Sequence, residues 1–75
     1  MTRLFHTNIS FNNEPVDYAV FFNDEGYHFQ SSKEKLAISF ILKREHEEWR
    51  TTENINEELK NNAITILEKY LLSQH

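Results

Sequence analysis

The sequence contains no cysteine, one glycine and one proline in 75 residues. The lack of cysteine excludes disulfide bonds, zinc ribbons and thiol chemistry, and it is consistent with a reducing compartment. A single glycine, Gly26, excludes the glycine-rich loops that bind phosphate groups. The chain also lacks an apolar run that could span a bilayer and the apolar segment of a signal peptide, so we expect a cytoplasmic protein without a membrane contact.

Aromatic residues, by contrast, make up 13% of the chain, which favours a packed core over disorder. A single domain over residues 1–75 buries only a small core, so contact with a second copy would add stability. The formal net charge of −4 makes the chain acidic and repels phosphate backbones. Composition therefore favours a protein partner over nucleic acid.

The clearest periodicity lies near the C-terminus, where apolar side chains recur at steps of three and four residues. This stripe consists of Ile55, Leu59, Ala63, Ile66, Leu67, Tyr70 and Leu71. It predicts a helix over 54–73, with Ile64 and Leu72 at or beyond the edges of the stripe. Asn54 is placed to cap this helix by accepting a hydrogen bond from the amide of Glu57.

Alternation of apolar and polar residues predicts strands over 3–11, 16–23, 27–30 and 35–43. A first hairpin through the Asn-Asn-Glu-Pro loop pairs Ile9 with Tyr18 and Phe5 with Phe22. The second turn allows a three-residue or a four-residue loop. The four-residue loop pairs Val20 and Phe22 with aromatic residues at 29 and 27, and burying those two rings outweighs the turn preference of Gly26.

Residues 44–51 allow two interpretations, a helical turn or a hairpin into a fifth strand over 47–51. A hairpin over Glu45 and His46 places Trp49 opposite Leu42 on the core face, which favours the strand. The expected fold class is α+β, an antiparallel β-meander of four to five strands with one C-terminal α-helix packed across one face. One helix covers one face of a sheet, so the other face meets solvent or a partner.

No catalytic, cofactor-binding or metal motif is present, and we expect a protein that is not an enzyme and has no cofactor. The expected register puts His6 and His28 on either side of Phe21, about 9–10 Å apart, which is too far for one metal ion. His46 is followed by two glutamates but lacks the second histidine of a metalloprotease helix.

The face away from the helix provides the candidate interaction site, because it combines apolar and polar side chains around Phe21. Its members are Leu4, His6, Phe21, His28, Ala37 and Ile41. We interpret the acidic run over 45–58 as a solvated edge together with carboxylates that interact favourably with the helix N-terminus. The alternative is that these carboxylates attract a basic partner. We therefore expect a cytoplasmic protein–protein interaction or self-associating module, with a homodimer as its least demanding assembly.

The alternative function is single-stranded nucleic-acid binding. The expected outline resembles, in architecture alone, the single-stranded nucleic-acid-binding coactivator, Whirly and Pur-type domains, and no motif in the residues matches theirs. Such surfaces need basic grooves with exposed aromatic rings, whereas the expected face offers Lys43 and Arg50 with little else. A small-ligand carrier with space between sheet and helix is a third, weaker possibility.

Overall fold

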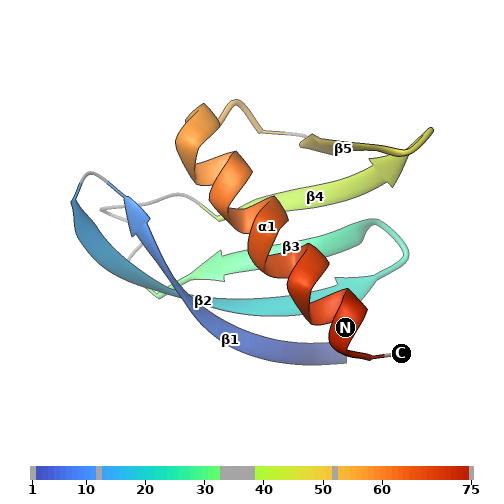
Figure 1. The fold of residues 1–75 in the computed structure, drawn as a ribbon, viewed down its shortest axis with the longest axis horizontal. Coiled ribbons are helices and arrows are strands. Elements are labelled where there is room, and N and C mark those ends of the chain that lie inside the picture. Colours follow the sequence, from blue (N-terminus) through green and yellow to red (C-terminus); the bar gives the residue numbers. More distant parts are fainter. Residues whose placement is uncertain (1, 12, 33–38, 52, 75) are drawn as a thin grey trace.

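The computed structural model describes residues 2–11, 13–32, 39–51 and 53–74, which form one antiparallel sheet and one helix (Figure 1). The strands are β1 (Thr2–Phe11), β2 (Glu14–Asn23), β3 (Gly26–Ser31), β4 (Phe40–Glu45) and β5 (Glu48–Thr51), and the helix is α1 (Glu57–Ser73). The strands lie in the order β1-β2-β3-β4-β5. This arrangement confirms the predicted α+β meander with a C-terminal helix. Part of the strand predicted over 35–43 lies outside the described residues, and β4 runs two residues further than predicted.

The first hairpin is tighter than predicted. Ile9 lies opposite Val16 and Phe5 lies opposite Val20, a shift of two residues from the expected pairing. The shorter turn is possible because Asn13 adopts a positive φ of 64°, a conformation that asparagine tolerates and that two-residue hairpin turns require. Because the shift is two residues, the side chains from Phe5 onward stay on their predicted faces. The register changes again between Arg3 and Phe5, where β1 is irregular.

The second hairpin has the predicted register, with Val20 opposite Phe29 and Phe22 opposite Tyr27. Asn23 and Gly26 form the last pair of the ladder. Gly26 has a φ of 134°, and a Cβ atom there would lie 2.6 Å from the main-chain oxygen of Leu42. The close approach of β4 therefore requires glycine at this position.

The third hairpin confirms the fifth strand but corrects its register. Trp49 lies opposite Arg44, and the predicted partner of Trp49, Leu42, lies opposite Thr51. The turn residues are His46 and Glu47, with φ values of 50° and 68°, rather than Glu45 and His46. Because the shift is again two residues, Trp49 stays on the same face as Leu42.

The helix α1 lies diagonally across one face of the sheet (Figure 1). It starts at Glu57, three residues later than predicted, and its capping residue is Asn56 and not Asn54. The side chain of Asn56 accepts hydrogen bonds from the amides of Glu58, at 2.8 Å, and Leu59, at 3.3 Å. The cap thus leaves Leu59 as the first buried residue of the helix.

The core lies between the helix and the face of the sheet that it covers. Its buried apolar residues are Ile9, Val16, Tyr18, Val20, Phe29, Phe40, Leu42, Leu59, Ala63 and Leu67. Phe29 and Phe40 stack with ring centroids 4.9 Å apart, and Tyr18 meets both rings edge-on. Of the two residues predicted at the edges of the helix stripe, Ile64 packs against this core and Leu72 is 74% exposed. Within the described ranges, no helix is long and apolar enough to cross a membrane.

Candidate interaction face

We call the face of the sheet opposite α1 the open face. The alternation of side chains along each strand places on it a row of residues from four adjacent strands, Arg3, Phe21, His28 and Ile41, which are paired across the sheet. Phe21, His28 and Ile41 are half-buried by their neighbours. The row carries two large apolar side chains, Phe21 and Ile41, and crosses four of the five strands.

The turn between β2 and β3 orients His28 within this row. The imidazole Nε2 of His28 lies 2.8 Å from Oδ1 of Asn23. The same Asn23 oxygen accepts a hydrogen bond from the amide of Glu25, also at 2.8 Å. The turn fixes the Asn23 side-chain oxygen, and this oxygen accepts a hydrogen bond from Nε2–H of His28. The bond holds the His28 ring beside Phe21. The row is therefore preorganised at its centre.

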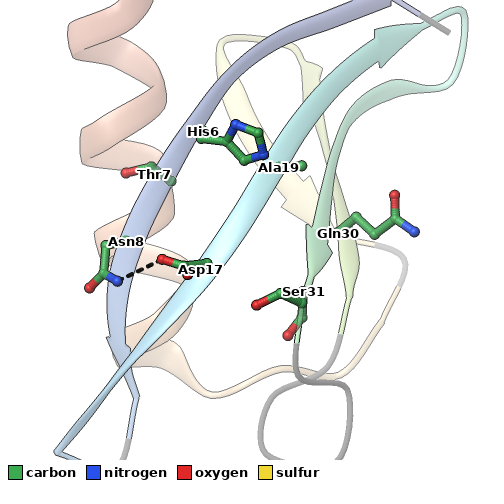
Figure 2. Close-up of a pocket in the computed structure, with 8 residues that line it drawn as sticks. His6, Thr7, Asn8, Asp17, Ala19, Gln30 and Ser31 are labelled. Atoms are coloured by element: carbon green, nitrogen blue, oxygen red, sulfur yellow. Dashed lines mark hydrogen bonds between the residues drawn. The ribbon is translucent and has the colours of Figure 1, made fainter.

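Next to this row, the small side chain of Ala19 leaves a hollow between β1 and β3. Ala19 pairs with His6 on one side and with Gln30 on the other. The hollow has a volume of about 710 Å³, and its described lining includes His6, Asn8, Asp17, Ala19, Gln30 and Ser32. Figure 2 shows the hydrogen bond at its rim, in which Nδ2 of Asn8 donates to Oδ1 of Asp17 at 2.9 Å. Asp17 is thus an exposed carboxylate that already accepts a hydrogen bond from Asn8.

The charges at the other end of the open face largely balance. Nζ of Lys43 lies 3.8 Å from Glu45, and the Arg50 guanidinium lies 3.8 Å from Glu45 and 3.6 Å from Glu48. All four side chains are well exposed, so these ion pairs add little stability. Lys43 and Arg50 are thus each paired with a carboxylate at this end of the face.

Three further glutamates of the acidic run, Glu53, Glu57 and Glu58, interact with the main chain or with the helix dipole. Oε2 of Glu53 accepts a hydrogen bond from the main-chain N–H of Ile41 at 3.2 Å, beyond the end of β5. Glu57 and Glu58 lie in the first turn of α1, where carboxylates interact favourably with the helix dipole. These positions fit the solvated-edge interpretation of the run.

The structure brings together three of the six predicted interaction residues, Phe21, His28 and Ile41. His6 lies opposite Ala19 instead of Phe21, so the predicted flanking of Phe21 by two histidines is wrong, because the first hairpin is two residues tighter. Leu4 lies in the irregularity of β1, between the paired residues Arg3 and Phe5. Ala37 lies outside the described residues.

Two members of the open face were missed from the sequence. Arg3 reaches the row of Phe21 only because of the irregularity in β1, and no sequence signal predicts that irregularity. Its guanidinium Nη2 contacts the imidazole of His6, at 2.6 Å from Nε2. Asp17 could have been found, since it alternates with Ala19 and Phe21 along β2.

The described residues contain no cluster of three or more histidine, aspartate or glutamate side chains that could hold a metal ion. Tyr18 is buried on the covered face, where desolvation raises the pKa of its phenol above the ordinary value. That phenol belongs to the core and not to the open face. The open face offers shape, apolar contact and hydrogen bonds, which are the means of binding a macromolecule.

The chain matches no family model, and no curated protein or solved structure is significantly similar to it.

Proposed function

We propose that this protein is a non-enzymatic cytoplasmic protein–protein interaction module that self-associates through its open face. The observation that carries the proposal is the row of Phe21, His28 and Ile41 on the face that α1 does not cover. Burial of this row against a second copy contributes roughly 25 cal/mol for each Å² of apolar surface, offset in part by the cost of association.

The balanced charge of the open face supports a second copy as the occupant. Because Lys43 and Arg50 are paired with Glu45 and Glu48, two such faces meet without net repulsion. A two-fold axis needs only one self-complementary patch, and the row supplies an apolar centre with polar surroundings. The small size of the domain adds to the benefit of burying this face.

The substitution Phe21→Glu tests the proposal. It places a charge at the centre of the row, so we expect the face-to-face contact to be lost and the sedimentation coefficient to fall. Phe22→Glu is the matched control, since Phe22 is the next residue of the same strand, faces the other side and is 44% exposed. Sedimentation at several concentrations, with circular dichroism to confirm folding, gives the result. Equal association of the wild type and Phe21→Glu, or a wild type that stays monomeric at high micromolar concentration, would contradict the proposal.

Single-stranded nucleic-acid binding is the second candidate, and one observation favours it. On the side of the sheet that carries the core, Phe22, Tyr27 and Trp49 form successive ring contacts with centroids 4.8 and 5.8 Å apart, and the Arg44 guanidinium lies 5.2 Å from the Trp49 ring centroid. Aromatic rings and arginine planes stack on bases. The acidic chain weakens this candidate. Quenching of Trp49 fluorescence by an oligonucleotide, lost steeply as salt rises, would support it.

A further inference from the structure

The outer edge of β1 carries main-chain groups that face away from the sheet. The amide of Ser32 donates to the main-chain oxygen of Asp17 at 3.0 Å, so Asp17 turns its main chain toward β3 and away from β1. Asp17 is the partner of Asn8, which makes their pair a non-hydrogen-bonded one. Because the two kinds of pair alternate, His6, Asn8 and Ser10 all direct their N–H and C=O groups to the outer edge.

The two edges of the sheet differ in how well they are protected against a further strand. β5 has four residues, Glu48–Thr51, and two of them are charged. β1 has ten residues, and no side chain from 5 to 11 is formally charged when histidine is neutral. Short strands and charges prevent edge-to-edge pairing, and long neutral edges permit it. The edge of β1 is thus the one suited to strand addition.

We propose that a second copy of this chain pairs antiparallel with β1 about a two-fold axis at Asn8, forming a continuous ten-stranded sheet. The regular part of β1 lies between the irregularity at Arg3 and Phe5 and the turn that contains Asn13, so it spans 5–11 with Asn8 at its centre. Asn8 then faces the partner's Asn8, and His6 faces the partner's Ser10. No like charges meet along this segment.

The helix supplies an independent indication of the same axis. A groove of about 270 Å³ separates β1 from α1, lined by Asn8, Ile9, Ser10, Asn62, Thr65 and Ile66. Tyr70 stacks on Phe5, so α1 runs along β1 in the opposite direction, with the segment around Asn62 and Thr65 level with Asn8. A two-fold axis at Asn8 therefore also passes between the middles of the two helices.

This placement makes the helices complementary in charge. Two antiparallel helices related by an axis between Asn62 and Thr65 put Glu58 beside the partner's Lys69, and Lys69 beside the partner's Glu58. Both side chains are exposed, and both lie on the same lateral side of α1 as Asn62. Within one chain the two residues are about 16 Å apart along the helix axis, too far to pair with each other.

The edge contact does not depend on the proposed function of the open face. A two-fold axis perpendicular to the sheet leaves both helices on one side and both open faces on the other. The row of Phe21 therefore stays accessible when β1 is paired, and both contacts together form a tetramer.

A charge-exchange experiment tests the edge contact. Glu58→Lys and Lys69→Glu each bring like charges together twice per dimer, and we expect each to weaken dimerisation roughly tenfold at low salt. The double variant restores opposite charges, and we expect wild-type affinity. Because the two residues are too distant to interact within one chain, restoration reports an intermolecular contact. The variants are measured by sedimentation equilibrium in both the wild-type and the Phe21→Glu background, which separates this contact from the open face.

The main chain of Asn8 gives a second test with a matched control. Asn8→Pro removes the outward main-chain N–H, and we expect it to abolish edge pairing. Asn8→Ala removes the same side chain but keeps this N–H, so we expect it to pair like the wild type. In the wild type, the amides of His6, Asn8 and Ser10 should exchange more slowly as concentration rises. Failure of the double charge variant to restore affinity, or amide exchange that is independent of concentration, overturns the proposal. If Asn8→Pro fails to fold, these two measurements still decide it.

Discussion

The phenyl ring of Phe5 stacks on the phenol ring of Tyr70, with centroids 4.4 Å apart and an angle of 24° between the planes. This contact joins the start of the first strand to the end of the helix, two segments that are separated by most of the chain (Figure 1). It fixes the direction of α1 along β1, on which the proposed edge contact depends.

The stacked pair should show a measurable coupling in a double-mutant cycle. We expect Phe5→Ala and Tyr70→Ala each to destabilise the fold, and their combined effect to fall short of the sum by about 0.5–1.5 kcal/mol. Chemical denaturation of the four proteins gives the value. Strict additivity would show that the rings do not interact in solution.

The buried face of the helix should dominate stability. Leu59 and Leu67 are 1% and 0% exposed, so replacing either with alanine leaves a cavity and should cost about 2–5 kcal/mol. Leu72→Ala is the matched control, because Leu72 is 74% exposed and should cost little. Thermal melting distinguishes the three variants. Wild-type melting of Leu59→Ala and Leu67→Ala would mean that α1 does not cover the sheet.

The turn between β4 and β5 stores backbone strain. His46 and Glu47 have φ values of 50° and 68°, a region that asparagine and glycine occupy at lower cost. We expect the double replacement His46→Asn, Glu47→Gly to raise the free energy of unfolding by about 1 kcal/mol. Urea denaturation measures the change. A destabilised double variant would place this turn in a different conformation.

Trp49 reports on the fifth strand. Its indole Nε1 is buried, and no described residue accepts a hydrogen bond from it, while Tyr27 and Arg44 lie against the ring. Its fluorescence should therefore be blue-shifted in the native protein and move to longer wavelength on unfolding. Collisional quenching by iodide, measured in the native and in the unfolded protein, reports the accessibility of the indole. Equal quenching in both would mean that β5 does not pack the indole against the sheet.

Tyr18 should make stability fall at high pH. Burial raises the pKa of its phenol in the folded state above the unfolded value of about 10. The two states therefore bind the proton equally below pH 10, and above it the unfolded state loses the proton first, so the free energy of unfolding decreases. Tyr18→Phe should reduce this decrease. Identical pH profiles for the two proteins above pH 10 would show that the phenol ionises without unfolding.

The faces of the strands and of the helix followed from the sequence alone. Alternation along β2 placed Val16, Tyr18 and Val20 in the core, and the helical stripe identified Leu59 and Leu67. These assignments held although two hairpin registers were each wrong by two residues. Side chains alternate between the two faces of a strand, so a register shift of two residues leaves each side chain on the same face. The sequence pattern therefore predicts which face a residue occupies better than which residue it pairs with.

Partners and edges were decided by tertiary structure. The shorter first turn and the displaced third turn rest on positive φ values at Asn13, His46 and Glu47, and outside glycine the composition of a loop does not reveal which residues adopt them. The irregularity that brings Arg3 beside the row of Phe21 is a register shift within β1, and the alternation of residues along the strand does not reveal it. Which strand edge stays open depends on strand order and on where α1 lies, and both are set by packing between distant segments that no local pattern encodes.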